Sequence, residues 1–344
     1  MLRTILADEI PNLVDLSAPF CEQEIDSFGL VALRARVEQF LQRQISDEQW
    51  SAIQRPSDIL AMEGHRATNI EALRAPTIRP ASRTRNHSLN MPQMAMGGLS
   101  ESWLLKELGD LHWSMIASGL GKTSSTITDG EGNRLYATFT RLSYFTYKSL
   151  SDFRENETLS LTDRMTRVGS GTFISEIEIG DGLGDFGAAS LLSNFSRRGG
   201  DSNASLLKGQ PVISADCPIP DTTSSSVIQE YRARRASEKP PSIYSTEYEI
   251  VPFHDINGVG LLYFAAYPII SDICTARYRP EIATEFSTTK RDIYYFTNAE
   301  PTETLVFNIH KWDETPERID METSISRKSD GVTMGYIITR KRRV

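Results

Sequence analysis

Several polar side chains occupy positions where they could take part in chemistry. His112 lies within an otherwise apolar segment and could transfer a proton, although a buried histidine fixed by Asp110 or by a backbone carbonyl gives the same pattern. Arg197 and Arg198 precede a Gly-Gly pair and could bind phosphate groups or remain as solvated loop charges. Asn203 could orient a carboxylate or thioester, although asparagines in glycine-rich loops mostly form turns. The candidates therefore cover proton transfer and anion binding.

Asp255 and Asn257 form a second polar group, in the segment His254-Asp255-Ile256-Asn257-Gly258. This group opens onto a run that is apolar almost all round, so both side chains stand at the predicted mouth of a buried helix. Both could face a bound substrate there. Capping of the helix is an equally good interpretation for either residue.

Some kinds of site are excluded by spacing. The five histidines have no metal-ligand spacing with one another or with the cysteines. The chain has no G-x-S-x-G nucleophile elbow. The segment 180–184 is rich in glycine, but no helix-forming run or phosphate-loop lysine follows it, which indicates a turn. We therefore expect neither a metal centre nor a serine hydrolase elbow.

The segment that must position the second polar group is residues 251–278. Its apolar run, residues 258–270, predicts a helix that is too short to span a bilayer and too apolar for a surface. Such a helix must be wrapped, usually by a curved sheet. Strand-like segments follow it at 292–297, 304–309 and 332–339.

The same order of elements occurs earlier in the chain. Residues 95–120 predict a turn and then a helix capped by Ser100, and strands are predicted at 135–145, 159–167 and 171–179. Because the two units lie about 155 residues apart, they indicate an internal duplication. The fold class predicted is α+β, a double hot dog with two long helices, each wrapped by an antiparallel sheet. Its halves span about 89–195 and 244–344, joined by a long polar connection.

Composition limits the possible partners. The chain has 344 residues and a net charge of −8, which disfavours nucleic acid as the main partner. The three cysteines are odd in number and far apart, which fits a reducing compartment. The N-terminus carries Asp8, Glu9 and Pro11 where a signal peptide needs apolar residues. We expect a cytoplasmic protein without a membrane partner, and a solvated basic ending at residues 340–343.

Residues 1–62 are predicted to form a small helical unit, and residues 63–88 a linker rich in proline and arginine. The pair Asp26-Ser27 stands at the head of the second helix and alone would be a helix cap. The order of residues across the unit resembles acyl and peptidyl carrier proteins. The matching pieces are Asp15-Leu16, Pro19-Phe20, Ile25-Asp26-Ser27-Phe28-Gly29-Leu30-Val31, Trp50 and Pro56-Ser57-Asp58-Ile59. The resemblance implies that Ser27 carries 4'-phosphopantetheine, with its phosphate at a helix N-terminus.

Residues 89–344 resemble the bifunctional acyltransferase/decarboxylase family of leinamycin-type polyketide biosynthesis. The matching pieces are Met91-Pro92-Gln93-Met94, Gly98-Leu99-Ser100-Glu101, Trp103 to Trp113, Gly132-Asn133-Arg134-Leu135-Tyr136-Ala137, Asn194-Phe195-Ser196-Arg197, Asn203, Asp255-Ile256-Asn257-Gly258, Leu262-Tyr263-Phe264-Ala265 and Arg291 to Phe296. The resemblance implies an enzyme that takes a malonyl- or methylmalonyl-type thioester from coenzyme A, decarboxylates it and delivers it to a carrier-protein thiol. Its partners would be acyl-CoA, its own or another carrier protein, and polyketide assembly-line proteins.

The same resemblance assigns roles to the candidate residues. It places a catalytic tyrosine at Tyr136, where the acyl group would be held as an ester; the residues alone favour a packing tyrosine with a bonded hydroxyl. His112 and Asn257 are further catalytic candidates, and Arg197, Asn203 and Asp255 are substrate-binding candidates. Decarboxylation leaves an enolate, so the site must offer hydrogen-bond donors to the thioester oxygen.

Two alternatives to this function remain open: another hot-dog enzyme, either a thioesterase or a dehydratase, or a protein without catalytic activity. A hot-dog thioesterase would use a helix carboxylate such as Asp110 or Asp272 to direct water. A dehydratase needs a histidine on one half that faces an acidic residue on the other, and Met91-Pro92 lacks the preceding histidine. The third possibility is a non-catalytic fold that shelters an acyl chain on its carrier.

Overall fold

The computed structural model describes residues 2–10, 13, 15–23, 25, 27–41, 45, 49–50, 52–62, 81–182, 184–199, 203, 206–215, 217–222 and 226–344. The predicted cap residue Asp26 lies outside these residues, as does most of the predicted linker, and Ser27 is described by its backbone alone. Among the described residues, no helix is both long and apolar enough to cross a membrane.

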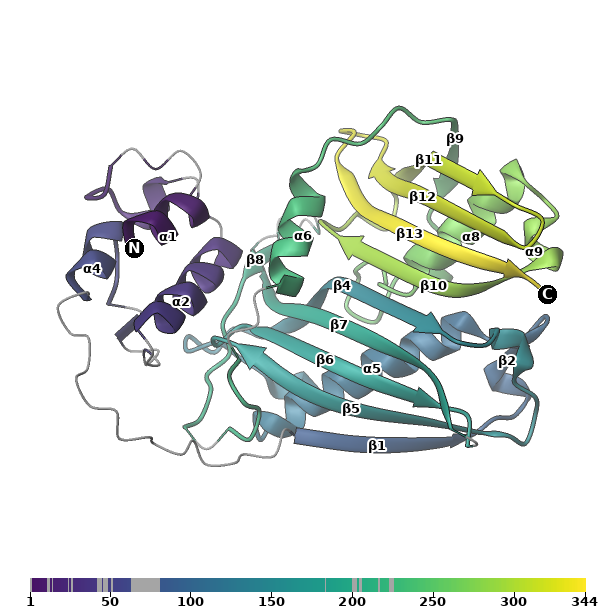
Figure 1. Cartoon of the computed structure of the whole chain (residues 1–344), viewed down its shortest axis with the longest axis horizontal. Coiled ribbons are helices and arrows are strands. Elements are labelled where there is room, and N and C mark those ends of the chain that lie inside the picture. Colours follow the sequence, from purple (N-terminus) through teal and green to yellow (C-terminus); the bar gives the residue numbers. More distant parts are fainter. Residues whose placement is uncertain are drawn as a thin grey trace.

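The N-terminal unit is a small group of helices with a core of its own (Figure 1). That core contains Leu2, Leu6, Leu33 and Val37, which recur at helical spacing on two of the helices. The helices are α1 (Leu2–Glu9), η1 (Phe20–Glu22), α2 (Ser27–Leu41) and α4 (Pro56–Ala61).

The first half of the larger unit wraps five strands around the helix α5 (Glu101–Gly119). The side chain of Ser100 accepts a hydrogen bond from the backbone N–H of Trp103 at 3.3 Å, as predicted for the cap. The strand order is β1-β5-β6-β7-β4. The strands are β1 (Ala81–Ser88), β4 (Tyr136–Thr146), β5 (Thr158–Val168), β6 (Thr172–Gly180) and β7 (Asp185–Arg198). Short elements around them are η3 (Met91–Gln93), β2 (Met94–Ala95), β3 (Gly98–Leu99), η4 (Ser124–Thr126) and η5 (Leu150–Asp152).

The second half repeats this plan around α8 (Ala266–Tyr278), with the strand order β9-β11-β12-β13-β10. Its strands are β9 (Tyr244–Glu249), β10 (Phe286–Tyr295), β11 (Thr304–Glu314), β12 (Arg318–Arg327) and β13 (Thr333–Arg343). Two short helices, α7 (Pro252–Asp255) and α9 (Ile282–Glu285), flank α8 in the chain.

The halves join where β4 pairs antiparallel with β10, with Leu142 opposite Ile293. The result is one 11-stranded sheet, which also includes β8 (Leu206–Lys208) beside β7. Both α5 and α8 lie on the same side of this sheet and share one large apolar core (Figure 1). The predicted α+β double hot dog is therefore confirmed, and the matched strand orders agree with an internal duplication.

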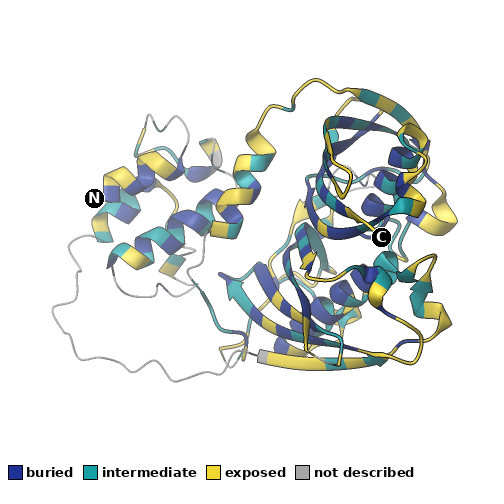
Figure 2. Ribbon diagram, turned by 45° about the vertical axis from the view of Figure 1, so that its right-hand side comes forward, coloured by how far each residue is buried: buried dark blue, intermediate teal, exposed yellow. Residues whose placement is uncertain are grey.

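The other face of the sheet is covered at the seam between the halves by α6 (Ser226–Ala236) and by α2 of the N-terminal unit (Figure 2). Ile228 and Tyr231 of α6 belong to a separate buried cluster on this face, together with Leu192 and Tyr294. Val31 of α2 packs against the same cluster. Glu9 of α1 also pairs with Arg232 of α6 at 3.1 Å, so the N-terminal unit is docked through more than one helix and does not share the central core.

Several predicted boundaries were wrong. The second central helix begins at Ala266 and not at residue 258, because the residues before it form a turn in which the N–H of Asn257 bonds to the carbonyl of Leu261. Strand β1 starts inside the segment predicted as a linker, and β12 was not predicted. The basic ending at residues 340–343 is part of β13 and not a solvated tail, since Lys341 is only 7% exposed.

Candidate active site

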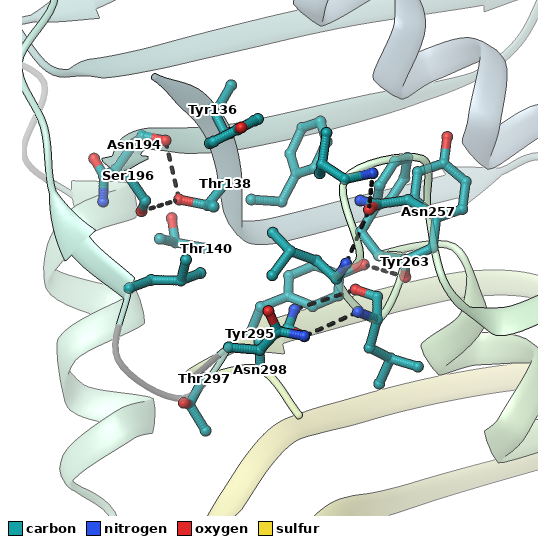
Figure 3. Close-up of a pocket in the computed structure, with 18 of the residues that line it drawn as sticks. Tyr136, Thr138, Thr140, Asn194, Ser196, Asn257, Tyr263, Tyr295, Thr297 and Asn298 are labelled. Carbon is teal, nitrogen blue, oxygen red and sulfur yellow. Dashed lines mark hydrogen bonds between the residues drawn. The ribbon is translucent and has the colours of Figure 1, made fainter. Parts of the chain in front are cut away.

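A cavity of about 650 Å³ lies between the two halves, on the side where β4 begins. The first half contributes the start of β4, the end of β7 and the middle of α5. The second half contributes the loop that leads into α8 and the residues that follow β10. Side chains from both halves point into the space between them (Figure 3). A thioester bound here would be surrounded by groups that no single half supplies.

Tyr136 lines the cavity as the first residue of β4. The turn before it is held by Asp129, whose Oδ1 accepts a hydrogen bond from the backbone N–H of Asn133 at 2.8 Å. The guanidinium of Arg134 lies 5.0 Å from the centre of the Tyr136 ring. Within the described part of the chain, the Tyr136 hydroxyl has no hydrogen-bond partner. The hydroxyl is therefore available to a ligand, and it lies in the cavity as the sequence prediction requires.

A group of hydroxyl and amide side chains lies beside Tyr136 on the first half (Figure 3). The hydroxyl of Thr138 lies 2.8 Å from that of Ser196, and it donates to the backbone carbonyl of Asn194 at 3.1 Å. Sequence reasoning missed Thr138 and Thr140 as lining residues. Their spacing of two and four residues from Tyr136 on one strand was the available signal, because such residues share a face.

Asn257 lines the cavity from the second half, at the loop before α8. Its side-chain Oδ1 accepts hydrogen bonds from the backbone N–H groups of Val259 at 3.1 Å and Leu261 at 3.0 Å. The oxygen therefore shapes the loop, while the amide nitrogen Nδ2 has no partner among the described residues. Asn257 thus combines both interpretations of the sequence, since it holds a turn and also offers a free donor to the cavity.

The loop is fixed at two further points by asparagines. Nδ2 of Asn203 donates to the carbonyls of Gly260 at 2.6 Å and Ala299 at 3.1 Å, and the Asn203 residue is only 5% exposed. Oδ1 of Asn298 accepts from the N–H of Leu262 at 2.9 Å. The sequence predicted Asn203 as a site residue but did not predict Asn298. The role of Asn298 depends on Leu262, which lies 36 residues earlier in the chain. Both side chains preorganise the wall that carries Asn257.

Three tyrosines of the second half complete the lining. Burial raises the pKa of Tyr263, Tyr267 and Tyr295, so all three carry their protons at neutral pH. The hydroxyl of Tyr295 donates to the carbonyl of Phe264 at 3.1 Å. Phe264 itself requires Gly109 on α5, because a Cβ at Gly109 would lie 2.4 Å from its ring. The close approach of α5 to the loop closes the apolar side of the cavity.

Three of the predicted site residues do not line the cavity. The carboxylate of Asp255 is buried and accepts hydrogen bonds from the Tyr248 hydroxyl at 2.9 Å and the Val251 N–H at 2.8 Å. The side chain of Arg197 lies 4.0 Å from Asp129, at the turn before Tyr136. The cavity therefore brings together Tyr136, Asn257 and Asn203, and leaves out Asp255, Arg197 and His112.

His112 is fully buried and belongs to a polar chain inside the first half. Its ring nitrogens lie 2.7 Å from the hydroxyls of Ser175 and Ser193, which replace the partners expected from the sequence. Burial lowers the pKa of His112 to about 3, so the ring is neutral. Ser175 also donates to Asp163 at 2.8 Å, and burial raises the pKa of Asp163 to about 7.

Four charged side chains are among the described lining residues of the cavity, namely Asp110, Arg134, Lys208 and Arg235. Asp110 is the one carboxylate among its described lining residues; its side chain is 63% exposed and pairs with Arg85 at 2.6 Å. Asp272, the other candidate water-directing carboxylate, does not line the cavity. In the described ranges, no group of three or more histidine, cysteine, aspartate or glutamate residues is arranged to hold a metal ion.

Comparisons with solved structures identify the fold. An acyl-ACP thioesterase from Bacteroides thetaiotaomicron is 13% identical, with a TM-score of 0.51 over 76% of this chain and 97% of its own. A 12:0-ACP thioesterase from Umbellularia californica is 9% identical, with a TM-score of 0.54 over 76% of this chain and 98% of its own. No family model matches the sequence, and no curated protein sequence matches it significantly. At this level of identity the likeness shows a hot-dog fold.

Proposed function

We propose that the protein is an enzyme that processes acyl thioesters in the cavity between its two halves. The named neighbours of the fold act on acyl groups held by acyl carrier protein, which supports this class of substrate. The volume of about 650 Å³ suits a small-molecule ligand. The lining joins apolar and aromatic walls to a few hydrogen-bond donors, as thioester chemistry requires.

Within this class we propose decarboxylation of a malonyl- or methylmalonyl-type thioester of coenzyme A, followed by transfer of the acyl group to a pantetheine thiol. The observation that carries this proposal is the lining: Asp110, which is exposed, is its only described carboxylate, whereas the Tyr136 hydroxyl and Nδ2 of Asn257 are donors without a partner among the described residues. Hydrolysis needs a base to activate water, whereas decarboxylation needs donors for the enolate oxygen.

The bond changes are as follows. The bond from the α-carbon to the carboxylate breaks, CO2 leaves, and the electron pair forms an enolate whose charge rests on the thioester oxygen. Tyr136 and Asn257 donate to that oxygen, water protonates the α-carbon, and the hydroxide that remains combines with the CO2 as bicarbonate. The Tyr136 oxygen then attacks the carbonyl carbon while the C–S bond breaks, and its proton leaves with the thiol of coenzyme A. The incoming pantetheine thiol attacks the resulting ester, and its proton returns to Tyr136.

The second candidate is a thioesterase. The names of the fold neighbours favour it, and Asp110 is a carboxylate on the central helix that reaches the cavity. Hydrolysis would require Asp110 to release Arg85 and direct a water at the thioester. The two candidates therefore differ in which residue is indispensable, Tyr136 or Asp110.

The proposal includes Ser27 as the point of attachment for 4'-phosphopantetheine, with loading by the enzyme's own cavity or by a partner. The support is the carrier-like order of residues in the N-terminal unit and the place of Ser27 at the first position of α2. A phosphate there would meet the free N–H groups of the helix N-terminus.

One experiment separates these functions. The purified protein is pantetheinylated, incubated with malonyl- or methylmalonyl-CoA, and weighed intact by mass spectrometry while free acids are measured in the solution. An acetyl or propionyl gain on the peptide that contains Ser27 supports decarboxylation and transfer. Release of free acid supports the thioesterase. If neither occurs with any acyl-CoA of a chain-length series, the proposal of an acyl-thioester enzyme is wrong.

A further inference from the structure

A second cavity, of about 410 Å³, lies between the N-terminal helical unit and the first half of the double hot dog. The helical unit supplies Phe20, Leu30, Trp50 and Ile53 among its walls, which are apolar and aromatic. The opposite wall is the turn at residues 169–172 and the segment 208–210. Neither unit alone would enclose this space, so it exists because the helical unit is docked.

The second cavity adjoins the first. Asn194 and Lys208 line both cavities, so the two spaces adjoin at these two side chains. Oδ1 of Asn194 accepts a hydrogen bond from Thr172 at 2.8 Å, and its Nδ2 has no partner among the described residues. Amide and hydroxyl groups therefore lie at the junction, within walls that are otherwise mostly apolar.

The helix that begins at Ser27 faces this space. Leu30, Val31 and Arg34 of α2 all line the second cavity, and Ser27 precedes them by three, four and seven residues. Residues at these spacings share one face of a helix, so the head of α2 stands on the side that faces the hot dog.

The docking of α2 is specific at this end. Val31 packs into the buried cluster under α6. Gly29 lies in the first turn of α2, and a Cβ added to it would lie 3.1 Å from Nη2 of Arg232 on α6. Nη1 of Arg232 donates a hydrogen bond to Glu9 at 3.1 Å. A Cβ on Gly29 would also lie 2.3 Å from Cγ1 of Ile25, so a larger side chain at Gly29 would require both Ile25 and Arg232 to move. The cation beside the first turn of α2 also suits a phosphate at the helix head.

We propose that the second cavity is the passage through which a linear pantetheine-type arm attached at Ser27 reaches the main cavity. This inference rests on the proposed function and states how the arm is loaded, namely within one chain. Such an arm alternates alkyl and amide units, which matches apolar walls with amide and hydroxyl groups at the junction. A transfer enzyme must admit two thiols, and two adjoining cavities give coenzyme A and the arm separate entrances.

The test follows the position of the arm and does not depend on catalysis. A coenzyme A analogue with a photoreactive diazirine in place of its thiol is transferred to Ser27 of the full chain by a phosphopantetheinyl transferase. After irradiation, the crosslinked peptides are identified by mass spectrometry. We expect intramolecular crosslinks to residues of the main cavity, at 136–140, 194–196 or 257–267.

A blocking variant and a matched control sharpen the test. A Cβ at Gly171 would meet Gln210 at 3.8 Å and the carbonyl of Gly209 at 3.9 Å, which are ordinary contacts, so Gly171→Leu fills the second cavity without strain. We expect it to reduce crosslinks in the main cavity by about tenfold or more, as an occluding side chain should. Gly130→Leu adds the same side chain where no atom lies within 4 Å, and should leave the crosslinks unchanged.

The inference is overturned if Ser27 accepts no analogue, if the crosslinks fall on the outer surface or on other molecules, or if both variants behave alike. Turnover of acyl-CoA is measured on the same preparations. Turnover without crosslinks in the main cavity would contradict the passage and leave the proposed function standing. Crosslinks without turnover of any acyl-CoA would contradict the proposed function and leave the passage standing.

Discussion

The two ends of the seam between the halves have opposite contents. At one end, the start of β4, the end of β7, the middle of α5 and the loop before α8 enclose an open cavity with one described carboxylate, Asp110, in its lining. At the other end, the surrounding elements are the middle of β10, the end of β13, the middle of α8 and the start of α5. There they supply Arg291, Lys341, Asp272 and Glu101, which form a charged network. The seam thus holds an open cavity at one end and a filled, charged network at the other.

The filled site is held by complete pairing of its charges. Arg291 is fully buried and donates to Glu101 at 2.7 Å and to Asp272 at 2.5 Å. Lys341 lies 3.1 Å from the second oxygen of Asp272. Burial opposes ionisation of Asp272, but the two cations lower its pKa to about 2. The comparison teaches that buried cations and carboxylates pair to fill one end of the seam, whereas the cavity at the other end has a single described carboxylate, the exposed Asp110.

The largest effect is expected from breaking the network. Arg291→Met leaves Glu101 and Asp272 without their main partner, and should lower the free energy of unfolding by about 3–5 kcal/mol. Urea denaturation followed by circular dichroism measures this change. Arg164→Met is the matched control, because Arg164 pairs with Glu178 at the surface and should cost less than about 1 kcal/mol. Equal losses for both variants would show that the buried network has no special role.

The two halves should also respond to pH in opposite directions. The raised pKa of Asp163, about 7, means that its contribution to stability is full at acid pH and is lost as the pH rises through 7. The lowered pKa of Asp272, about 2, means that its contribution is present above the unfolded value and is lost at strongly acid pH. Asp163→Asn should therefore gain about 3 kcal/mol relative to the wild type between pH 5 and pH 8, since each pKa unit corresponds to about 1.4 kcal/mol.

The readout is the difference in unfolding free energy between variant and wild type at each pH, which removes the contributions of all other groups. Asp272→Asn serves as the counterpart and should be most destabilising at neutral pH. If the Asp163→Asn difference does not change with pH, the burial of an uncharged carboxyl group in the first half is contradicted.

Much of this comparison was visible in the sequence. The two central helices and the strands β4, β5, β6, β10, β11 and β13 follow from local periodicity. The Ser100 cap follows from a residue type that commonly accepts a hydrogen bond from the N–H three positions later. The repeated order of elements predicted the duplication. Tyr136, Asn257 and Asn203 were named as site residues and they do line one cavity.

What the sequence could not provide depends on partners far along the chain. Lys341 looked like part of a solvated ending because Asp272 and Thr288, its partners, lie in other elements. His112 was assigned the wrong partners because Ser175 and Ser193 come from strands 63 and 81 residues later. The charged network and the cavity can be told apart only when β4 and β10 are paired in space.

At the open end, Tyr136→Phe should reduce turnover by about 100-fold or more, since it removes a donor or nucleophile in the cavity. Its effect on stability should be below about 1 kcal/mol, because the hydroxyl has no partner to lose among the described residues. Turnover is measured as loss of acyl-CoA, and stability by urea denaturation. Tyr147→Phe removes an exposed hydroxyl, at 62% exposure, and should leave both unchanged. Unchanged turnover in Tyr136→Phe would remove Tyr136 from the mechanism.

The smallest effect is expected from the carboxylate at the rim. Asp110→Asn removes an exposed charge that pairs with Arg85, and under decarboxylation and transfer it should change turnover by less than about threefold. Glu107→Gln is the matched control, because Glu107 lies on the same helix and contacts the same arginine at 3.4 Å. A loss of about 100-fold in Asp110→Asn alone would instead assign Asp110 as the base and make hydrolysis the reaction. Hydrolysis would then depend on a carboxylate at the edge of the cavity. The cavity and the charged network would both use a carboxylate, and they would differ in whether it is exposed or buried among cations.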